Sequence, residues 1–249
     1  MTREDYKEKN NMKDFNNMYN ELSEYLTCDR CLEIGFGSGA YTREFASYCN
    51  HLDAIDISKE CYDNAIQNLG DLKNITFHLM DACKTDFPDK QFDLVISVNT
   101  FHEIDMSSGK IDLELKHTAL KEMIRLSNTI CFIEELPENL CCELFKVFNP
   151  DEDHSLRIKK SNELMEKVMK ENGYKVVVND VAVNKIPFSS KEEMQNEMLS
   201  WWSDIKVPST TEERKQMINQ INEILESQKM LTNLCFEDIV RYIVYRKED

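Results

Sequence analysis

Long apolar runs are absent from this sequence. No stretch approaches the roughly 20 consecutive apolar residues that a membrane-spanning helix needs, and the first residues lack the apolar core of a secretion signal. We therefore expect a cytoplasmic protein with no membrane partner. Hydrophobic residues form 41% of the chain and charged residues 31%, which is typical of a globular protein and argues against a disordered one.

Positive charge is also in short supply. The chain has 30 Lys and Arg against 46 Asp and Glu, a net charge of −16. A nucleic-acid binder has to neutralise phosphates with clustered Lys and Arg, and the field of this chain repels polyanions. We therefore expect no nucleic-acid partner. A cationic partner or a neutral small molecule suits the charge better, although solubility alone also explains it. The sequence does not predict an oligomeric state.

Cysteine is plentiful, but the usual spacing of a zinc site is missing. The nine cysteines include one CxxC pair, Cys28 and Cys31, and one adjacent pair, Cys141 and Cys142. A structural zinc site usually combines two CxxC pairs, often with His. Because the count is odd and no export signal is visible, we expect reduced thiols and no metal site.

After an expected helix over residues 10–27, strand-like and helix-like segments alternate along the chain. Such alternation predicts right-handed crossovers and a mostly parallel sheet with helices on both faces. The expected strands are 31–34, 51–57, 75–79, 92–98, 129–134, 174–183 and 239–245, and the further helices are 40–47, 59–69, 113–126, 162–172, 190–202 and 211–230. The sequence therefore predicts an α/β fold with seven strands.

Two helical stretches interrupt this alternation between the last two strands. We interpret them as a cap inserted before the final strand. The expected organisation is an N-terminal helical cap (1–27), a core (28–189), a helical cap insertion (190–234) and the final strand of the core (235–249).

Glycine is scarce, and its distribution is uneven. Three of the six glycines, Gly35, Gly37 and Gly39, fall within five residues at the end of the first expected strand. Glycine permits positive φ and close backbone approach, and a helix N-terminus directs N–H groups at a ligand. In open α/β sheets the ligand crevice lies at the carboxyl ends of the strands, so this segment predicts a binding loop.

The glycine pattern alone leaves the ligand open. Gly35-x-Gly37-x-x-Ala40 also satisfies the dinucleotide fingerprint of dehydrogenases. Asp56, about 20 residues further on, serves either ligand, because a carboxylate there binds ribose hydroxyls.

Three further features separate the two ligands. Glu33 precedes the loop, where a dinucleotide site usually has an apolar residue. Asp81 follows the third strand and Asn99 the fourth. With the glycines and Asp56, these features resemble the class I S-adenosylmethionine-dependent methyltransferases over residues 31–135. The resemblance implies a Rossmann-like class I methyltransferase fold and S-adenosylmethionine as cofactor.

The resemblance also implies a role for each matching residue. Glu33, Gly35, Gly37 and Gly39 would hold the methionine end of the cofactor, Asp56 the ribose, Ile57, Asp81 and Ala82 the adenine, and Asn99 the methionine part. Two alternatives stay open: Asp56 as the cap of the next helix, and Asp81 as a turn residue. The Lys-Pro-Gly-Gly turn that family members often carry before the fifth strand is missing at 124–130, which makes the subfamily harder to assign.

Methyl transfer from a sulfonium depends mainly on alignment and on exclusion of water. A general base helps only when the acceptor holds a proton at neutral pH. His102, after the fourth strand, is the candidate base, with Glu103 beside it to orient it; the alternative is that His102 only shapes the loop. Glu134 and Glu135, after the fifth strand, either face the crevice or are solvated.

Three aromatic residues complete the candidates. His154 falls in an expected loop at 150–155. Trp201 and Trp202 end a cap helix, where they could enclose an acceptor or a cation; we favour their anchoring the cap. Glu135 and Trp201 are the candidate substrate residues. We expect a small-molecule acceptor. The alternatives are a protein or carrier-bound acyl group, or a catalytically silent binding domain.

Overall fold

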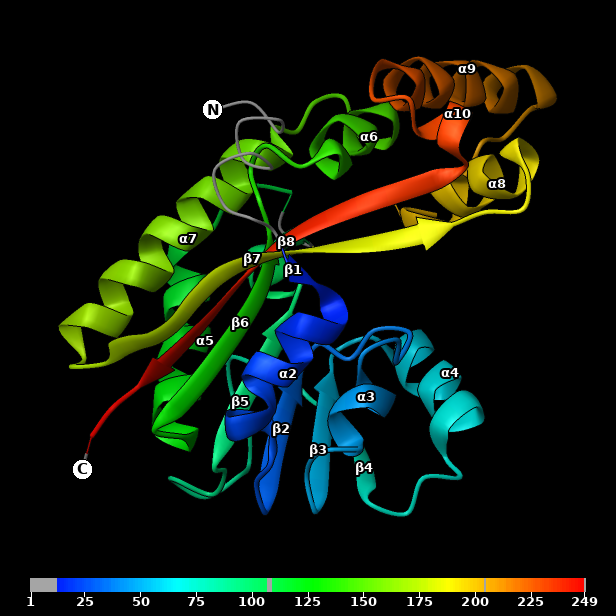
Figure 1. Cartoon of the computed structure of the whole chain (residues 1–249). Helices are drawn as coiled ribbons and strands as arrows, with labels where there is room; N and C mark the ends of the chain where they lie inside the picture. The colour runs from blue at the N-terminus through cyan, green and yellow to red at the C-terminus, as the bar shows by residue number, and fades with distance from the viewer. Residues whose placement is uncertain (1–12, 107–108, 204, 249) are drawn as a thin grey trace. The chain divides into compact units, whose positions relative to one another are not determined.

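The structure, a computed structural model, describes residues 13–106, 109–203 and 205–248 (Figure 1). The first 12 residues, which include the start of the expected helix at 10–27, lie outside the described residues. The described part contains one eight-stranded sheet in the order β1-β7-β8-β6-β5-β2-β3-β4, flanked by helices. The expected α/β class is thereby confirmed.

The eighth strand is the two-residue β1, which pairs with β7 and has no counterpart among the expected strands. The strands are β1 Lys13–Asp14, β2 Arg30–Ile34, β3 His51–Asp56, β4 Ile75–Leu79, β5 Leu94–Val98, β6 Thr129–Glu135, β7 Lys175–Pro187 and β8 Cys235–Arg246. The helices are α2 Phe15–Leu26, α3 Thr42–Ala46, α4 Lys59–Leu69, a 3₁₀ turn η1 Phe101–Glu103, α5 Leu113–Leu126, α6 Leu140–Phe148, α7 His154–Glu171, α8 Lys191–Trp201, α9 Thr211–Ser227 and α10 Met230–Asn233.

Parallel pairing places the carboxyl ends of neighbouring strands at one edge of the sheet. β2 pairs in parallel with β3 and β5, β3 with β4, and β5 with β6. Ile34 at the end of β2 lies opposite Ile55 of β3 and Ser97 of β5. The loops that follow β2, β3 and β5 therefore begin side by side. β7 and β8 run in opposite directions (Figure 1).

The chain divides into two compact units. In the described part, the sheet unit comprises residues 16–134, 160–180 and 241–248. The helical unit comprises residues 13–15, 135–159 and 181–240. The helical unit includes the helices between β7 and β8.

The core of the sheet unit forms between the sheet and two helices. Every residue of β5 is buried, as its continuous apolar character predicts. Helix α5 buries one face at three- and four-residue spacing, and α7 contributes a similar face. Their buried apolar residues are Ala119, Leu120, Met123, Leu126, Met165, Val168 and Met169.

The helical unit has its own core, rich in methionine. Met194 and Met198 of α8 pack with Met217 of α9 and Met230 of α10. Methionine is flexible and fills irregular gaps between short helices. None of the described helices is both long and apolar enough to cross a membrane.

Two expectations about residues 135–161 are wrong. Helix α6 was not expected, because it is only nine residues long and seven of these are buried, so Glu143 and Lys146 alone mark its polar face. Helix α7 begins at His154 and not at 162, so His154 does not lie in a loop.

Glu122 of α5 fastens this helix to the loop after β4. Its carboxylate accepts hydrogen bonds from Arg125 at 2.7 and 2.9 Å, from the N–H of Thr85 at 2.8 Å and from the Thr85 hydroxyl at 2.6 Å. The bonds from Arg125, followed by those from Thr85, lower the pKa of Glu122 from 4.5 to about 2.

The lowered pKa predicts a pH-dependent contribution to stability. The contribution is complete above pH 4.5, the ordinary value, and is lost as the pH falls toward 2. We expect Glu122→Gln to lower the melting temperature at pH 7 by roughly 2–4 °C, about 1 kcal/mol, and to have little effect near pH 2. Calorimetry at both pH values checks this, with exposed Glu163→Gln as the control. An equal decrease in melting temperature at pH 7 and pH 2 would contradict a contribution that depends on the ionised Glu122 carboxylate.

Candidate active site

The glycine loop after β2 has the backbone that its sequence predicts. Gly35, Gly37 and Gly39 have φ values of +73°, +52° and +82°. A Cβ atom on Gly35 would overlap the side chain of Thr100, which follows β5. The Thr100 hydroxyl donates a hydrogen bond to the Gly35 carbonyl at 3.1 Å. The loop after β5 is therefore in direct contact with the loop after β2.

Asp56 joins the end of β3 to the same loop. One carboxylate oxygen accepts a hydrogen bond from the N–H of Gly37 at 2.9 Å, and the other accepts from the N–H of Ser58 at 2.8 Å. Helix α4 is capped by Ser58, whose hydroxyl accepts from Cys61 N–H at 3.2 Å. Asp56 is therefore not the capping residue, and its carboxylate lies beside the glycine loop.

Glu33, one residue before the end of β2, carries a buried carboxyl group, and one of its two oxygens lacks a hydrogen-bond donor among the described residues. Only 2% of the residue is exposed. Burial raises its pKa to about 8; the nearby Thr42 hydroxyl lowers it, and the charge of Asp56 raises it further. Its Oε2 atom nevertheless forms no hydrogen bond of ordinary geometry with the described residues. A buried carboxylate is costly unless a cation or several donors pair with it.

Asn99, directly after β5, has a left-handed backbone with φ of +45°. Asn adopts this region more readily than most residues. Its N–H still donates to the carbonyl of Ile133 at 2.8 Å, so the ladder with β6 continues. Its buried Oδ1 has no hydrogen-bond partner among the described residues. The turn thus leaves an amide oxygen available at the carboxyl edge of the sheet.

The ends of β3 and β4 present the three remaining cofactor candidates. Ile57 is 73% exposed, which is unusual for an isoleucine beside a buried strand. Asp81 is exposed and its carboxylate accepts from the N–H of Cys83 at 2.8 Å, so it does lie in a turn. Ala82 packs against the core of the sheet unit.

His102, in η1, forms a buried pair with Glu134 of β6. His102 Nδ1 and Glu134 Oε2 are 2.5 Å apart, and Glu134 Oε1 accepts from the N–H of Phe101 at 2.9 Å. His102 is 2% exposed and Glu134 3%. Glu134 is therefore not a solvated carboxylate. Glu103 is farther away, with Oε1 3.8 Å from His102 Nε2. The residue that orients the imidazole is thus Glu134.

Lys116 of α5 contacts the backbone of the η1 turn. It was not among the residues that the sequence indicated. Its ammonium donates to the carbonyls of Phe101 at 3.2 Å and His102 at 2.6 Å, and to the carboxylate of Asp105 at 2.7 Å. Lys116 and Asp105 are both completely buried. The signal was available, because Lys116 precedes Ala119 by three residues on the apolar face of α5.

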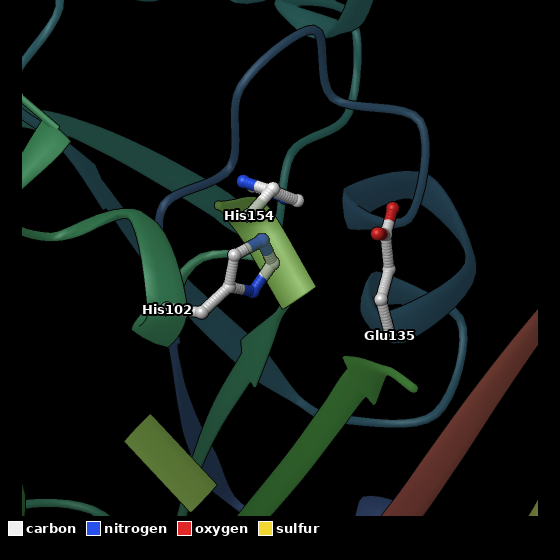
Figure 2. Close-up of side chains that lie close together, drawn as sticks. All are labelled: His102, Glu135 and His154. Carbon is white, nitrogen blue, oxygen red and sulfur yellow. The ribbon is translucent and has the colours of Figure 1, made fainter. Parts of the chain in front are cut away.

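Figure 2 shows the side chains of His102, Glu135 and His154 with the elements that carry them. His102 belongs to the sheet unit, and the other two belong to the helical unit. Within the helical unit, His154 is buried and its ring stacks on Phe145, with centroids 4.2 Å apart. Glu135, the last residue of β6, is half-buried.

Trp201 and Trp202 pack within the core of the helical unit. The Trp201 ring lies 4.9 Å from Phe236, edge to face, and its Nε1 donates to Glu197 at 3.1 Å. Trp202 packs on Phe145 at 5.9 Å and on Phe148 at 5.3 Å. Contact of Trp201 with an acceptor stays a prediction.

Most of the cysteine thiols are too deeply buried to act as nucleophiles. All nine are free thiols. Burial raises the pKa of Cys49, Cys83 and Cys131 to about 12. Because only the thiolate reacts readily, these side chains serve packing. Cys28 differs, since a hydrogen bond with Cys31 lowers its pKa.

Comparison with known proteins places this site in a family. Residues 32–133, about two fifths of the chain, match the family model described as a methyltransferase domain. The match contains the glycine loop, Asp56 and the η1 turn, and it decides against the dehydrogenase interpretation of the glycines. Residues 32–133 therefore form a methyltransferase domain. A search of curated protein sequences gives no match.

Three solved structures share the fold. A Bacillus halodurans protein, provisionally named a methyltransferase, is 16% identical over 94% of this chain and 98% of its own, with a TM-score of 0.62. A Galdieria sulphuraria protein, provisionally named a sarcosine dimethylglycine methyltransferase, is 14% identical over 94% and 84%, with a TM-score of 0.57. The N-methyltransferase NodS from Bradyrhizobium japonicum WM9, in complex with S-adenosyl-L-homocysteine, is 12% identical over 95% and 89%, with a TM-score of 0.50.

The contact between the loops after β2 and β5 predicts unequal effects at two glycines. Gly35→Ala combines a positive φ, costing roughly 1–2 kcal/mol, with overlap of Thr100, costing roughly 1–3 kcal/mol. Gly37→Ala has only the first cost, because nothing lies within 4 Å of its Cβ position. Urea unfolding should therefore show the larger loss for Gly35→Ala. Equal losses would mean that the close contact with Thr100 is absent.

Proposed function

We propose that S-adenosylmethionine binds at the carboxyl edge of β2, β3, β4 and β5. Each of these strands ends in a residue or loop suited to one part of the cofactor. The assignments are Glu33 to the ammonium group, the three glycines and Asn99 to the methionine part, Asp56 to the ribose hydroxyls, Ile57 and Ala82 to the faces of the adenine, and Asp81 to its amino group. When bound, the cofactor supplies an electrophilic methyl group on a sulfonium.

Glu33 is the observation that carries this proposal. It is a buried carboxyl group whose Oε2 lacks a well-formed hydrogen bond among the described residues, at the edge where the glycine loop begins. An ammonium group that reaches Oε2 would provide the missing donors and the opposite charge. The exposed Ile57 offers an apolar surface for a flat ring at the end of the neighbouring strand.

We further propose that the acceptor is a small molecule with an ionisable proton, such as an amine or a hydroxyl compound. Glu134 beside Nδ1 of His102 favours the tautomer in which Nδ1 carries the proton, so Nε2 is the nitrogen that takes up a proton from the acceptor. The same carboxylate stabilises the imidazolium that then forms. His102 would serve as the general base, and Glu134 and Lys116 would position it.

The charge of the chain and two structural relatives support a small acceptor. A net charge of −16 opposes binding of a nucleic-acid backbone. The names of two proteins of the same fold refer to methyl transfer onto nitrogen or onto small amines.

The high pKa of Glu33 predicts pH-dependent cofactor binding. Below pH 8 the free protein holds a proton on Glu33, and an ammonium ligand has to displace it. The affinity for S-adenosylhomocysteine should therefore rise by up to about tenfold per pH unit from pH 6 to 8 and then level off. Titration calorimetry measures this for the protein and for Glu33→Gln, which should bind weakly and without that slope.

The matched control is Glu60→Gln, at an exposed position on α4. It should show the same rise of S-adenosylhomocysteine affinity with pH as the unaltered protein. An unchanged slope in Glu33→Gln would show that another group is responsible. Failure of the unaltered protein to bind S-adenosylhomocysteine at millimolar concentration would refute the site itself.

Removal of the base should separate binding from turnover. We expect His102→Ala to bind S-adenosylhomocysteine normally and to lower kcat by roughly 10²–10⁴-fold on a proton-bearing acceptor. Glu134→Gln should lower kcat less and shift the pH profile of kcat/KM. A panel of amines, hydroxyl compounds and acids, free and carrier-bound, measures the acceptor class. Activity on carrier-bound acids alone would replace the small-molecule proposal, and absence of activity on every acceptor would favour a silent binding domain.

A further inference from the structure

A second cluster of polar side chains lies in the helical unit. One side-chain ligand atom from each of Glu135, Cys141 and Asp238 lies within 4.8 Å of the other two. These residues come from the end of β6, the first turn of α6 and the start of β8. Cys141 is 3% exposed and Asp238 8%, and Glu135 is half-buried. Three separate segments thus bring a sulfur and two carboxylates together away from bulk water.

Asn139 gives an independent indication that this cluster receives a ligand. Asn139 occupies the N-cap position of α6, where an Asn side chain usually accepts hydrogen bonds from the first turn, but its side chain makes no such bond. Its amide is turned to the cluster instead. Nδ2 donates to the Asp238 carboxylate at 2.9 Å and to the carbonyl of Ile239 at 3.0 Å. Asn139 is 2% exposed, and its Oδ1 has no hydrogen-bond partner in the described ranges.

The charges of the cluster favour a dication. Two carboxylates at this separation repel each other in a partly buried site. A divalent ion would neutralise both carboxylates and would accept the lone pair of the Asn139 amide oxygen. The sulfur of Cys141 then selects the kind of ion, because thiolates prefer zinc-like metals over magnesium or calcium.

The distances are compatible with tetrahedral zinc. In a tetrahedral site, zinc bonds of about 2.0–2.3 Å place neighbouring ligand atoms roughly 3.3–3.5 Å apart. Small rotations of side chains that already lie within 4.8 Å of one another reach that arrangement. Among the nearby residues, His154 also has a ring nitrogen within 4.8 Å of the Glu135 carboxylate.

We propose that Glu135, Cys141 and Asp238 bind one zinc ion, with Oδ1 of Asn139 as the fourth donor. The thiol proton of Cys141 is released to solvent when the zinc–sulfur bond forms. The ion joins β6, α6 and β8 within the helical unit, so its role is structural. This inference does not depend on the proposed acceptor, and it assigns Glu135 to a metal in place of the tentative role in substrate binding.

Titration with zinc chloride tests the proposal on the full chain after removal of metals with a chelator. Calorimetry should show one zinc ion per chain, and zinc should raise the melting temperature. Cys141→Ser and Asp238→Asn should each weaken binding at least tenfold. Cys142→Ser is the matched control, because the Cys142 thiol is also buried in α6 but donates to the carbonyl of Leu136 at 3.9 Å. This variant should bind zinc as the unaltered chain does.

Cobalt(II) provides a second measurement that does not depend on the stability of one variant. A thiolate-to-cobalt charge-transfer band should appear with the unaltered chain and with Cys142→Ser, and it should be absent with Cys141→Ser. Circular dichroism verifies that each variant is folded, and Glu135→Gln, at a half-buried position, provides a third ligand substitution. No binding by the unaltered chain, or binding that survives in Cys141→Ser, would overturn the proposal.

Discussion

The close approach of Gly35 to the side chain of Thr100 is the constraint on which the active site depends. It joins the loops after β2 and β5, two parallel neighbours that end at the same edge of the sheet. Because the Gly35 backbone has no space for a Cβ atom, the two loops are held together without an intervening side chain. His102 follows Thr100 by two residues, and Asp56 reaches the glycine loop through the N–H of Gly37.

Buried charge explains the chemistry that this edge supports. His102 and Glu134 pair with each other, and Lys116 pairs with Asp105 beneath the same turn. Glu33 differs from these, because its burial raises its pKa to about 8 and its Oε2 has no hydrogen-bond partner among the described residues. The edge therefore combines a buried imidazole–carboxylate pair with a second buried carboxyl group that a cationic ligand would suit.

Much of this edge could be predicted from the sequence, for identifiable reasons. Three glycines within five residues predict a tight loop, and the continuous apolar run of β5 predicts a buried parallel strand. Asp56 lies against the glycine loop because its spacing from that loop follows from one helix and one strand; its role in ribose binding stays a prediction. Each of these patterns is local, because it lies within one element and the segment that follows it in the chain.

The features that were missed depend on residues far apart in the sequence. The Glu134 carboxylate resembles a solvated loop residue until β6 is paired with β5 and brings it to His102. Helix α6 has only nine residues and a polar face of two, Glu143 and Lys146, so its sequence is a weak signal until the rest of the helical unit packs on it. The cluster of Glu135, Cys141 and Asp238 joins segments about 100 residues apart, and no CxxC spacing marks it.

The measurement that tests the central claim most directly is a crystal structure of the protein with S-adenosylhomocysteine. The account predicts ligand density along the carboxyl edge of β2 to β5, with the ligand's ammonium group at Glu33, its ribose at Asp56 and its adenine on Ile57. Density at any other edge of the sheet, or a ligand whose ammonium group lies away from Glu33, would contradict it.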